Sequence, residues 1–217
     1  MAQRIIDPNN RGKPTGQKRV VQLPPEARDH KFVPDFERCK PGDLILSRSV
    51  EPTFIEAEIV KFHDRAGFGP ADSCWTHAAV FLYEDFVVEA DKDGVRTRTL
   101  YNDIPGSLLR VRRRPGLSIG DRYKIALCAQ RMLGMRYDLK GAVQLGLEAK
   151  KSKMWDREPK MMPEAKDAVI CSEVFYDAHR QITRTLLADC PDVGVTPAHL
   201  SATADLEDVF VPWLELT

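Results

Sequence analysis

The sequence predicts an α+β fold, in which strand signals come first and most helix signals come later. Three observations lead to this class. Apolar runs of strand length gather between residues 44 and 113, and the turn Asp91–Gly94 separates two of them as a hairpin. After residue 117, apolar residues adopt helical spacing behind a capping residue. The chain has 217 residues, of which 43% are hydrophobic, so it is long enough for one domain with its own core.

The first half supplies the predicted sheet. Order begins at the turn sequence KPGD, residues 40–43, and the first core strand follows it. A short amphipathic helix and a Gly/Pro-rich loop then precede a series of further strands, the last of which is stopped by Pro115. The predicted ranges are 44–46 for the first strand, 54–62 for the helix, 67–73 for the loop, and 76–83, 86–90, 95–100 and 108–113 for the later strands.

The second half supplies the predicted helices. Ser118 and Asp121 form an S-x-x-D capping pattern, and Gly134 is a suitable C-terminal stop. The helical stripe between them consists of Ile119, Tyr123, Ala126, Leu127 and Leu133. Further helices are predicted over 138–150, over 169–184 and after Thr196-Pro197, with a closing strand over 209–211.

Two segments stand outside this pattern. Residues 1–38 are rich in Pro, Asn, Gly, Lys and Arg with little periodicity, and are predicted to form an extended or mobile arm before a domain at 39–217. Residues 151–166 are charged and contain two prolines, and are predicted to be a loop or insertion.

Charge and hydropathy exclude some classes of partner. Lys plus Arg number 32 and Asp plus Glu number 32, so no global field draws the chain to nucleic acid or anionic membrane. Arg110, Arg112, Arg113 and Arg114 could form a local basic patch, although the exposed side of a strand end is the favoured interpretation. No apolar stretch reaches the roughly 20 residues of a transmembrane helix. The N-terminus lacks the apolar region of a secretory signal, so we expect synthesis in the cytoplasm and export only by a specialised system.

The sequence contains no motif typical of a metal site or of nucleotide binding. The five cysteines contain no C-x-x-C pair, and an odd number leaves at least one thiol free. His63, His179 and His199 lack metal-ligand spacing, and neither a P-loop nor G-x-G-x-x-G occurs. We therefore expect no metal and no cofactor.

Cys171 is the cysteine with a chemical rationale. It follows the apolar pair Val169-Ile170 and stands at the start of a predicted helix. The partial positive charge at a helix N-terminus stabilises a thiolate, which is the nucleophilic form. A small buried hydrophobe is the alternative interpretation of such a cysteine taken alone.

His77 and Glu89 are the predicted partners of this thiol. His77 begins an apolar strand, where a histidine is costly unless it is hydrogen-bonded. Glu89 lies between apolar residues on the following strand, and adjacent antiparallel strands could set it beside His77, whose second N–H it would accept. A satisfied core histidine and a solvent-facing glutamate are the alternatives. His179 follows Cys171 by eight residues on one helix, about 12 Å along the axis, so it is excluded as the base.

Several short motifs occur in an order that resembles a known family. They are PGD at 41–43, THAAV at 76–80, VEA at 88–90, GMRYD at 134–138, CSE at 171–173 and TPAHL at 196–200. Histidine precedes cysteine, as in the circularly permuted NlpC/P60 hydrolases, papain-like proteins of the YiiX and lecithin:retinol acyltransferase-like branch. The resemblance covers roughly residues 40–212. It implies an antiparallel sheet packed against helices, with Cys171 as nucleophile, His77 as base and Glu89 as its orienting group. Tyr137 is implied near the oxyanion, and Ser172 is included as a second substrate-contacting residue.

The resemblance makes an amide bond of bacterial peptidoglycan stem peptides the leading substrate. Because the wall lies outside the cytoplasm, this substrate implies an antibacterial effector carried by a specialised secretion system, with a secretion component and an immunity protein as partners. A cytoplasmic amidase, a lipid-directed acyltransferase and a catalytically silent papain-like binding module remain as alternatives.

Overall fold

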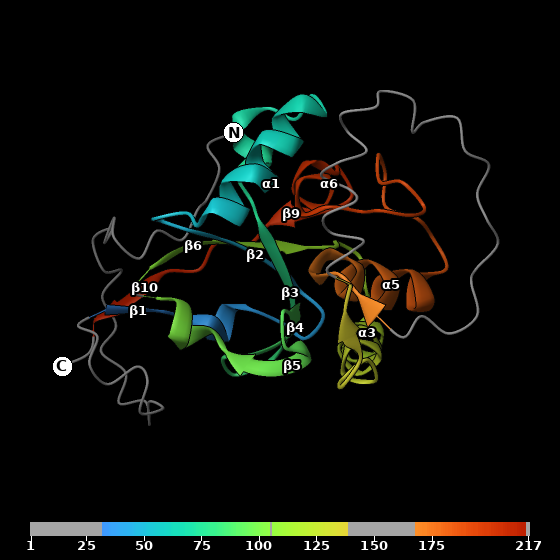
Figure 1. Ribbon diagram of the computed structural model, residues 1–217. Helices are drawn as coiled ribbons and strands as arrows, with labels where there is room; N and C mark the ends of the chain where they lie inside the picture. Colours follow the sequence, from blue (N-terminus) through green and yellow to red (C-terminus); the bar gives the residue numbers. More distant parts are fainter. Residues whose placement is uncertain (1–31, 105, 139–167, 216–217) are drawn as a thin grey trace.

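The computed structural model describes residues 32–104, 106–138 and 168–215, and within them the core is an antiparallel sheet in the order β5-β4-β3-β2-β6-β9 (Figure 1). All strands predicted between residues 44 and 113 are present. The α+β class is confirmed, because helices pack on this sheet. The strands are β2 (Leu44–Ser49), β3 (His77–Tyr83), β4 (Phe86–Asp91), β5 (Gly94–Thr99), β6 (Ser107–Arg113) and β9 (Glu207–Asp208).

Alternation along each strand divides the buried apolar side chains between two faces of the sheet. On one face, residues such as Leu46 and Val80 pack against α3 (Ile119–Gln130) and α5 (Cys171–Thr183), which lie side by side in Figure 1. On the other face, residues such as Ile45 and Phe81 pack against the short helices η2 (Phe36–Arg38) and η3 (Leu100–Asp103) and the C-terminal segment.

The last residues of the predicted arm, 32–38, belong to the folded domain. Residues 32–38 were assigned to the arm, yet β1 (Phe32–Pro34) pairs with β10 (Trp213–Glu215) in an antiparallel ladder. Val33 and Phe36 are buried in the second core. Residues 1–31, the segment 151–166 and nearly all of the predicted helix 138–150 lie outside the described residues.

Local capping explains where the first helices begin. Thr53 and Glu56 form a capping box at α1 (Phe54–Arg65), and Ser118 accepts the Asp121 N–H at α3. The predicted loop 67–73 contains the single turn α2 (Pro70–Ser73).

The α3 stripe predicted from the sequence does not form the helix's buried face. Ile119, Tyr123, Leu127 and Leu133 are all exposed, and of the predicted set only Ala126 is buried. The packed face is instead formed by Ile125, Ala126, Cys128 and Ala129, together with the buried Arg122. The two stripes share Ala126 but are centred on different sides of the helix, so the predicted buried face was wrong.

The C-terminal strand is displaced from its predicted position. Residues 209–211 are not in a strand, and they lie between β9 and β10, which pair with different partners. Val209 and Val211 are nevertheless buried. The apolar alternation at 209–211 therefore reflects burial of a connecting segment and not a strand. Upstream of it, α6 (Pro197–Ala202) follows its N-cap Thr196 as expected.

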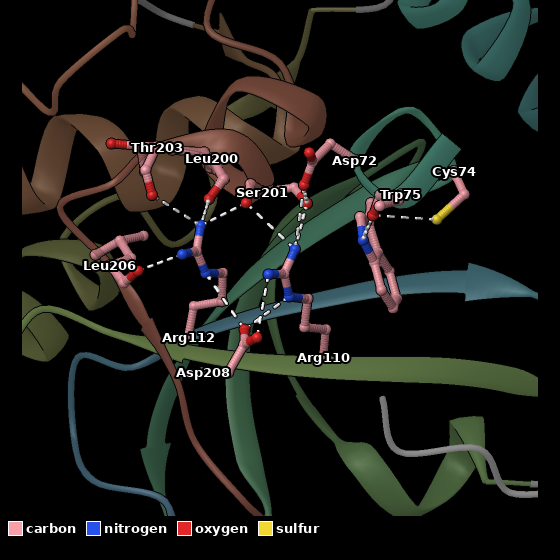
Figure 2. A network of polar contacts seen from close by, with 11 residues as sticks. Asp72, Cys74, Trp75, Arg110, Arg112, Leu200, Ser201, Thr203, Leu206 and Asp208 are labelled. Atoms are coloured by element: carbon pink, nitrogen blue, oxygen red, sulfur yellow. Dashed lines mark hydrogen bonds and ion pairs between the residues drawn. The ribbon is translucent and has the colours of Figure 1, made fainter. Parts of the chain in front are cut away.

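The arginine run on β6 forms neither a basic patch nor an exposed strand end. Arg110 is buried and its Nε lies 2.7 Å from Asp208, while its Nη1 reaches Asp72 at 3.3 Å (Figure 2). Arg112 is also buried and donates to main-chain carbonyls of α6 and the residues after it, including Leu200 at 3.1 Å. These contacts hold the C-terminal segment against the sheet.

The other two arginines of the run are also matched by carboxylates. Arg113 Nε donates to Asp43 at 2.8 Å, and Arg114 lies 3.3 Å from Asp205. Aspartates distant in the sequence therefore pair with these two arginines as well. A search of the described residues finds no helix with the length and hydropathy needed to cross a membrane.

Candidate active site

Strand register places His77 and Glu89 on one face of the sheet. Ala79 of β3 is the Cα partner of Glu89 on β4, and His77 lies two residues before Ala79. Residues two apart on a strand share a face, so the two side chains are diagonal neighbours. Their separation of 2.9 Å, from Nε2 of His77 to Oε2 of Glu89, is that of a hydrogen bond.

Glu89 is buried but strongly satisfied. Its side chain is 2% exposed, whereas that of His77 is 26% exposed. Burial alone would raise the pKa of the Glu89 carboxyl, but the contacts with His77 and Arg98 outweigh burial and lower it to about 2. The side chain at this position is therefore a carboxylate, and it presents one oxygen to the imidazole.

Cys171 meets the imidazole from a distant part of the chain. It is the first residue of α5, and it is buried beside the sheet. The Ile170 N–H before it donates to Glu173 at 3.1 Å, so the helix start is capped by its own first turn. The Cys171 side chain lies close enough to the imidazole to raise the pKa of His77, through its charge and through hydrogen bonding. His77 therefore contacts both the thiol and the carboxylate.

The electrostatics of His77 follow from these two partners. Burial lowers its pKa, yet the charge and hydrogen bond of Cys171, followed by those of Glu89, raise that pKa well above its usual value of 6.5. Both neighbours of the imidazole therefore favour its protonated form. The arrangement can hold a thiolate–imidazolium pair, which is the reactive state of a cysteine nucleophile.

Tyr137 lies within electrostatic range of the thiol. It belongs to β7 (Arg136–Tyr137), which pairs in parallel with β8 (Ala168–Val169) immediately before α5. Burial and then the negative charge of Cys171 raise the pKa of its hydroxyl, so the hydroxyl stays protonated and can donate.

The hairpin between β4 and β5 sets the position of the segment before Tyr137. The Val95 N–H donates to Met135 O at 2.9 Å, and the Gly134 N–H donates back to Val95 O at 3.0 Å. Gly94 has a φ of +101°, and a Cβ there would lie 2.7 Å from Met135 O. A glycine is required both by this dihedral angle and by the close approach.

The Ser172 hydroxyl points away from this group of residues. It donates to Val195 O at 2.6 Å and the residue is completely buried. The side chain therefore anchors α5 to the residues before α6. What remains for a substrate at this position is the backbone N–H in the first turn of the helix.

A second network holds the strand end that carries His77. Glu56 of α1 accepts the Ser49 hydroxyl at 2.6 Å and the Thr76 hydroxyl at 3.3 Å. Burial raises the pKa of Glu56, but these and the Thr53 hydrogen bonds outweigh it and lower the pKa. The helix α1 is thereby tied to the residue next to His77.

The remaining described histidines serve internal packing. His63 Nδ1 lies 2.9 Å from Ser73 O, and His199 Nδ1 lies 2.8 Å from the Thr196 hydroxyl. His179 is buried on α5 and stacks on Phe175. Within residues 32–104, 106–138 and 168–215, no group of three or more His, Cys, Asp or Glu side chains is arranged to hold a metal ion.

Sequence reasoning missed two residues. Arg98 donates from its guanidinium to Glu89, and Asp103 accepts from the same arginine. One signal was available. A glutamate between apolar residues needs a cation, and the return strand of the hairpin offers Arg96 and Arg98 at alternating positions. Choosing between the two requires the geometry of their side chains.

Comparison with known proteins gives a likeness of fold. Neither a protein-family model nor a curated protein sequence matches the chain. Among solved structures, the metalloprotein YiiX of Escherichia coli O157:H7 aligns with a TM-score of 0.54 at 18% identity. The alignment covers 78% of this chain and 96% of YiiX. The chain therefore has a YiiX-like fold.

Proposed function

We propose that the protein is a thiol hydrolase of the circularly permuted NlpC/P60 type, with a papain-like active site. One observation carries the proposal: three separate elements bring together Cys171, His77 and Glu89, with Glu89 hydrogen-bonded to His77 at 2.9 Å and Cys171 near enough to the imidazole to raise its pKa. Geometry of this kind is how nucleophile, base and orienting group are recognised across unrelated folds.

The reaction assigned to this site is acyl transfer. The Cys171 thiolate attacks the carbonyl carbon of an amide, and a carbon–sulfur bond forms while the carbonyl oxygen becomes an oxyanion. Protonated His77 gives its proton to the leaving nitrogen as the carbon–nitrogen bond breaks, which leaves a thioester. Water then attacks the thioester, His77 accepts a proton from it, and the thiolate and a carboxylic acid are released.

Groups near the start of α5 are suited to holding the oxyanion. The first N–H groups of a helix lack intrahelical acceptors and lie at the positive end of the dipole. Ser172 contributes such an N–H, and the Tyr137 hydroxyl is a second candidate donor because its raised pKa keeps it protonated.

For the substrate, we propose the peptide stems of bacterial peptidoglycan, reached by delivery through a specialised secretion system. The proposal rests on the sequence resemblance described above, whereas the likeness to YiiX is one of fold. Cytoplasmic amides and lipid esters are the competing substrates for the same thiol chemistry.

A metal role, suggested by the description of YiiX as a metalloprotein, fits these residues poorly. Nε2 of His77 already contacts Glu89, and both oxygens of the Glu89 carboxylate accept hydrogen bonds from Arg98. The three side chains therefore contact one another in a row, whereas metal ligands converge on one point.

The direct test is incubation of the full-length protein with purified peptidoglycan, followed by mass spectrometry of the released products. Wild-type protein should release fragments with new termini at one type of amide bond, and Cys171→Ala should release none. Identical product profiles from the two proteins would contradict the proposal. Cys128→Ala, which alters a buried thiol of α3, is the matched control and should behave as wild type.

A second experiment locates the substrate. The protein is expressed in a bacterial host with and without an added periplasmic signal, and cell lysis is followed. A wall hydrolase should lyse cells only when it is sent to the periplasm, and Cys171→Ala should abolish the lysis. Toxicity restricted to the cytoplasm would favour an amidase or acyltransferase, and no effect in either compartment would favour a binding module.

A further inference from the structure

Arg98 occupies a special position behind the proposed catalytic residues. It lies on β5, and its side chain is 19% exposed between two carboxylates. Its Nε donates to Oε1 of Glu89 at 2.6 Å and its Nη2 donates to Oε2 at 2.9 Å. A side-on pair of this kind fixes both the distance and the plane of the carboxylate.

The same guanidinium also binds a second carboxylate, that of Asp103. Nη1 donates to Oδ1 of Asp103 at 2.6 Å, and Nη2 donates to Oδ2 at 2.8 Å. Asp103 comes from η3, the turn that follows β5. Asp103 thus also binds Arg98, and the two carboxylates together restrict rotation of the Arg98 side chain.

These contacts fix the orientation of the Glu89 carboxylate. Oε1 faces Arg98, and Oε2 is shared between Arg98 and the imidazole of His77. Without the guanidinium, a carboxylate that is only 2% exposed would lose most of its hydrogen bonds and its compensating charge.

We propose that Arg98 is a positioning residue of the active site, which holds Glu89 ionised and aimed at His77, and that Asp103 holds Arg98 in turn. The proposal rests on the proposed function and extends its hydrogen-bond chain to Cys171–His77–Glu89–Arg98–Asp103. Arg98 does not touch substrate. It acts through Glu89 on the tautomer and orientation of the imidazole.

Arg96 supplies a matched control on the same strand. It lies on the same face, two residues away, but its Nε is 3.8 Å from Glu89 and its side chain is 46% exposed. Its closer ion pair is with Asp91 at the end of β4. Charge alone would make the two arginines similar, whereas positioning requires the bidentate contact that only Arg98 makes with Glu89.

The test compares full-length wild type with Arg98→Met, Arg98→Lys and Arg96→Met. Two readouts are taken: the low-field proton NMR signal of the hydrogen-bonded His77 N–H, and the pH profile of Cys171 alkylation by iodoacetamide. Arg98→Met should lose the NMR signal and react about 10²-fold more slowly near neutral pH, the scale of loss that misplacement by about 1 Å can cause. Its rate should also fall on the acid side at higher pH than in wild type, because Glu89 protonates more easily.

The variants separate positioning from general electrostatics. Arg98→Lys keeps the charge but not the fork, so it should recover only part of the rate, and Arg96→Met should keep both the signal and the profile. An unchanged signal and profile in Arg98→Met, or an equal loss in Arg96→Met, would overturn the inference. If Arg98→Met does not fold, Arg98→Lys decides alone: loss of the signal supports the inference, and an unchanged signal and profile overturn it.

Failure of the proposed function would look different. A wild-type protein that leaves peptidoglycan intact, with no preferential alkylation of Cys171, would remove the hydrolase assignment. The NMR signal of His77 in the same samples still reports whether Arg98 positions Glu89.

Discussion

Nε2 of His77 lies 2.9 Å from Oε2 of Glu89, across two adjacent antiparallel strands. This contact commits one ring nitrogen of the imidazole to a carboxylate and leaves the other for the Cys171 thiol. The order of contacts is that of a nucleophile, a base and an orienting group.

Cys171 should be the thiol that iodoacetamide modifies first at pH 6. Cys74 and Cys190 are more exposed than Cys171, so access alone would favour them. Burial raises the pKa of both, that of Cys190 to about 12, whereas Cys171 has the His77 imidazole as a partner. Peptide mapping of the labelled protein checks the order. His77→Ala should abolish the preference, and labelling in the order of exposure would contradict the assignment.

His77→Gln should lower the rate of amide cleavage by roughly 10²–10⁴-fold, the usual contribution of a general base. Glutamine keeps a hydrogen-bonding group of similar size but cannot accept and return the proton. The kcat/KM of His77→Gln is compared with those of Cys171→Ala and the double variant. Because the two residues act as a unit, the double variant should be little worse than the worse single one. Additive losses would show that they act independently.

The pKa of His77 should fall when its thiol partner is removed. Burial lowers the pKa of this imidazole, and the charge and hydrogen bond of Cys171 are the largest opposing influences. In Cys171→Ala, an NMR titration of the imidazole should therefore give a lower pKa than in wild type. Cys128→Ala is the control and should leave the titration unchanged. An unaltered pKa in Cys171→Ala would mean that the thiol and the imidazole do not interact in solution.

Glu89 should make the protein sensitive to acid. Its pKa is about 2 in the folded protein and 4.5 ordinarily, so its stabilisation is complete above pH 4.5 and is lost as the pH falls towards 2. At about 1.4 kcal/mol for each pH unit, this contribution is on the order of 3 kcal/mol at neutral pH. Urea unfolding at several pH values between 5 and 2.5 should show a smaller pH dependence in Glu89→Gln than in wild type.

The matched control for this acid effect is Glu58→Gln, because Glu58 forms an exposed ion pair with Lys61 on α1. Pairs of this kind contribute about 0–1 kcal/mol, so its pH dependence should follow wild type. If Glu89→Gln and Glu58→Gln gave the same curve, Glu89 would not be the carboxylate that causes the acid sensitivity.

Arg110→Met should destabilise the fold by about 3 kcal/mol, because it removes the buried cation that pairs with Asp72 and leaves Asp208 with the longer contact to Arg112, at 3.5 Å. Chemical denaturation measures the loss. Lys61→Met removes a cation from an exposed pair and should change stability by less than about 1 kcal/mol. Equal effects of the two substitutions would mean that the network of Figure 2 does not hold the C-terminal segment on the sheet.

Gly94→Ala should be more damaging than Gly116→Ala, although both glycines have positive φ. A Cβ at Gly94 would meet Met135 O at 2.7 Å, whereas nothing lies within 4 Å of one at Gly116. Strain of this kind typically costs about 1–3 kcal/mol, and it should also displace the segment that carries Tyr137. Thermal unfolding and the Cys171 labelling rate are the measurements. Equal melting temperatures for the two variants would contradict the close approach.

Features that depend on near neighbours in the chain could be predicted from the sequence. The strands of the first half, the caps at Ser118 and Thr196, and the placement of Cys171 at a helix start all follow from short patterns. Glu89 and His77 were noticeable for a related reason, since a polar side chain within an apolar strand requires a partner. Local periodicity and burial cost are properties of a few consecutive residues, so they can be read without a fold.

Which partners these residues have depends on how the chain folds. The register of β3 and β4 puts His77 beside Glu89, and the packing of α5 brings Cys171 from a distant segment. The same applies to Arg98, to the aspartates that neutralise the arginines of β6, and to the buried face of α3. Ion pairs and hydrogen bonds act over a few ångströms in space and carry no signal of fixed sequence spacing, so their partners are settled only when the chain has folded.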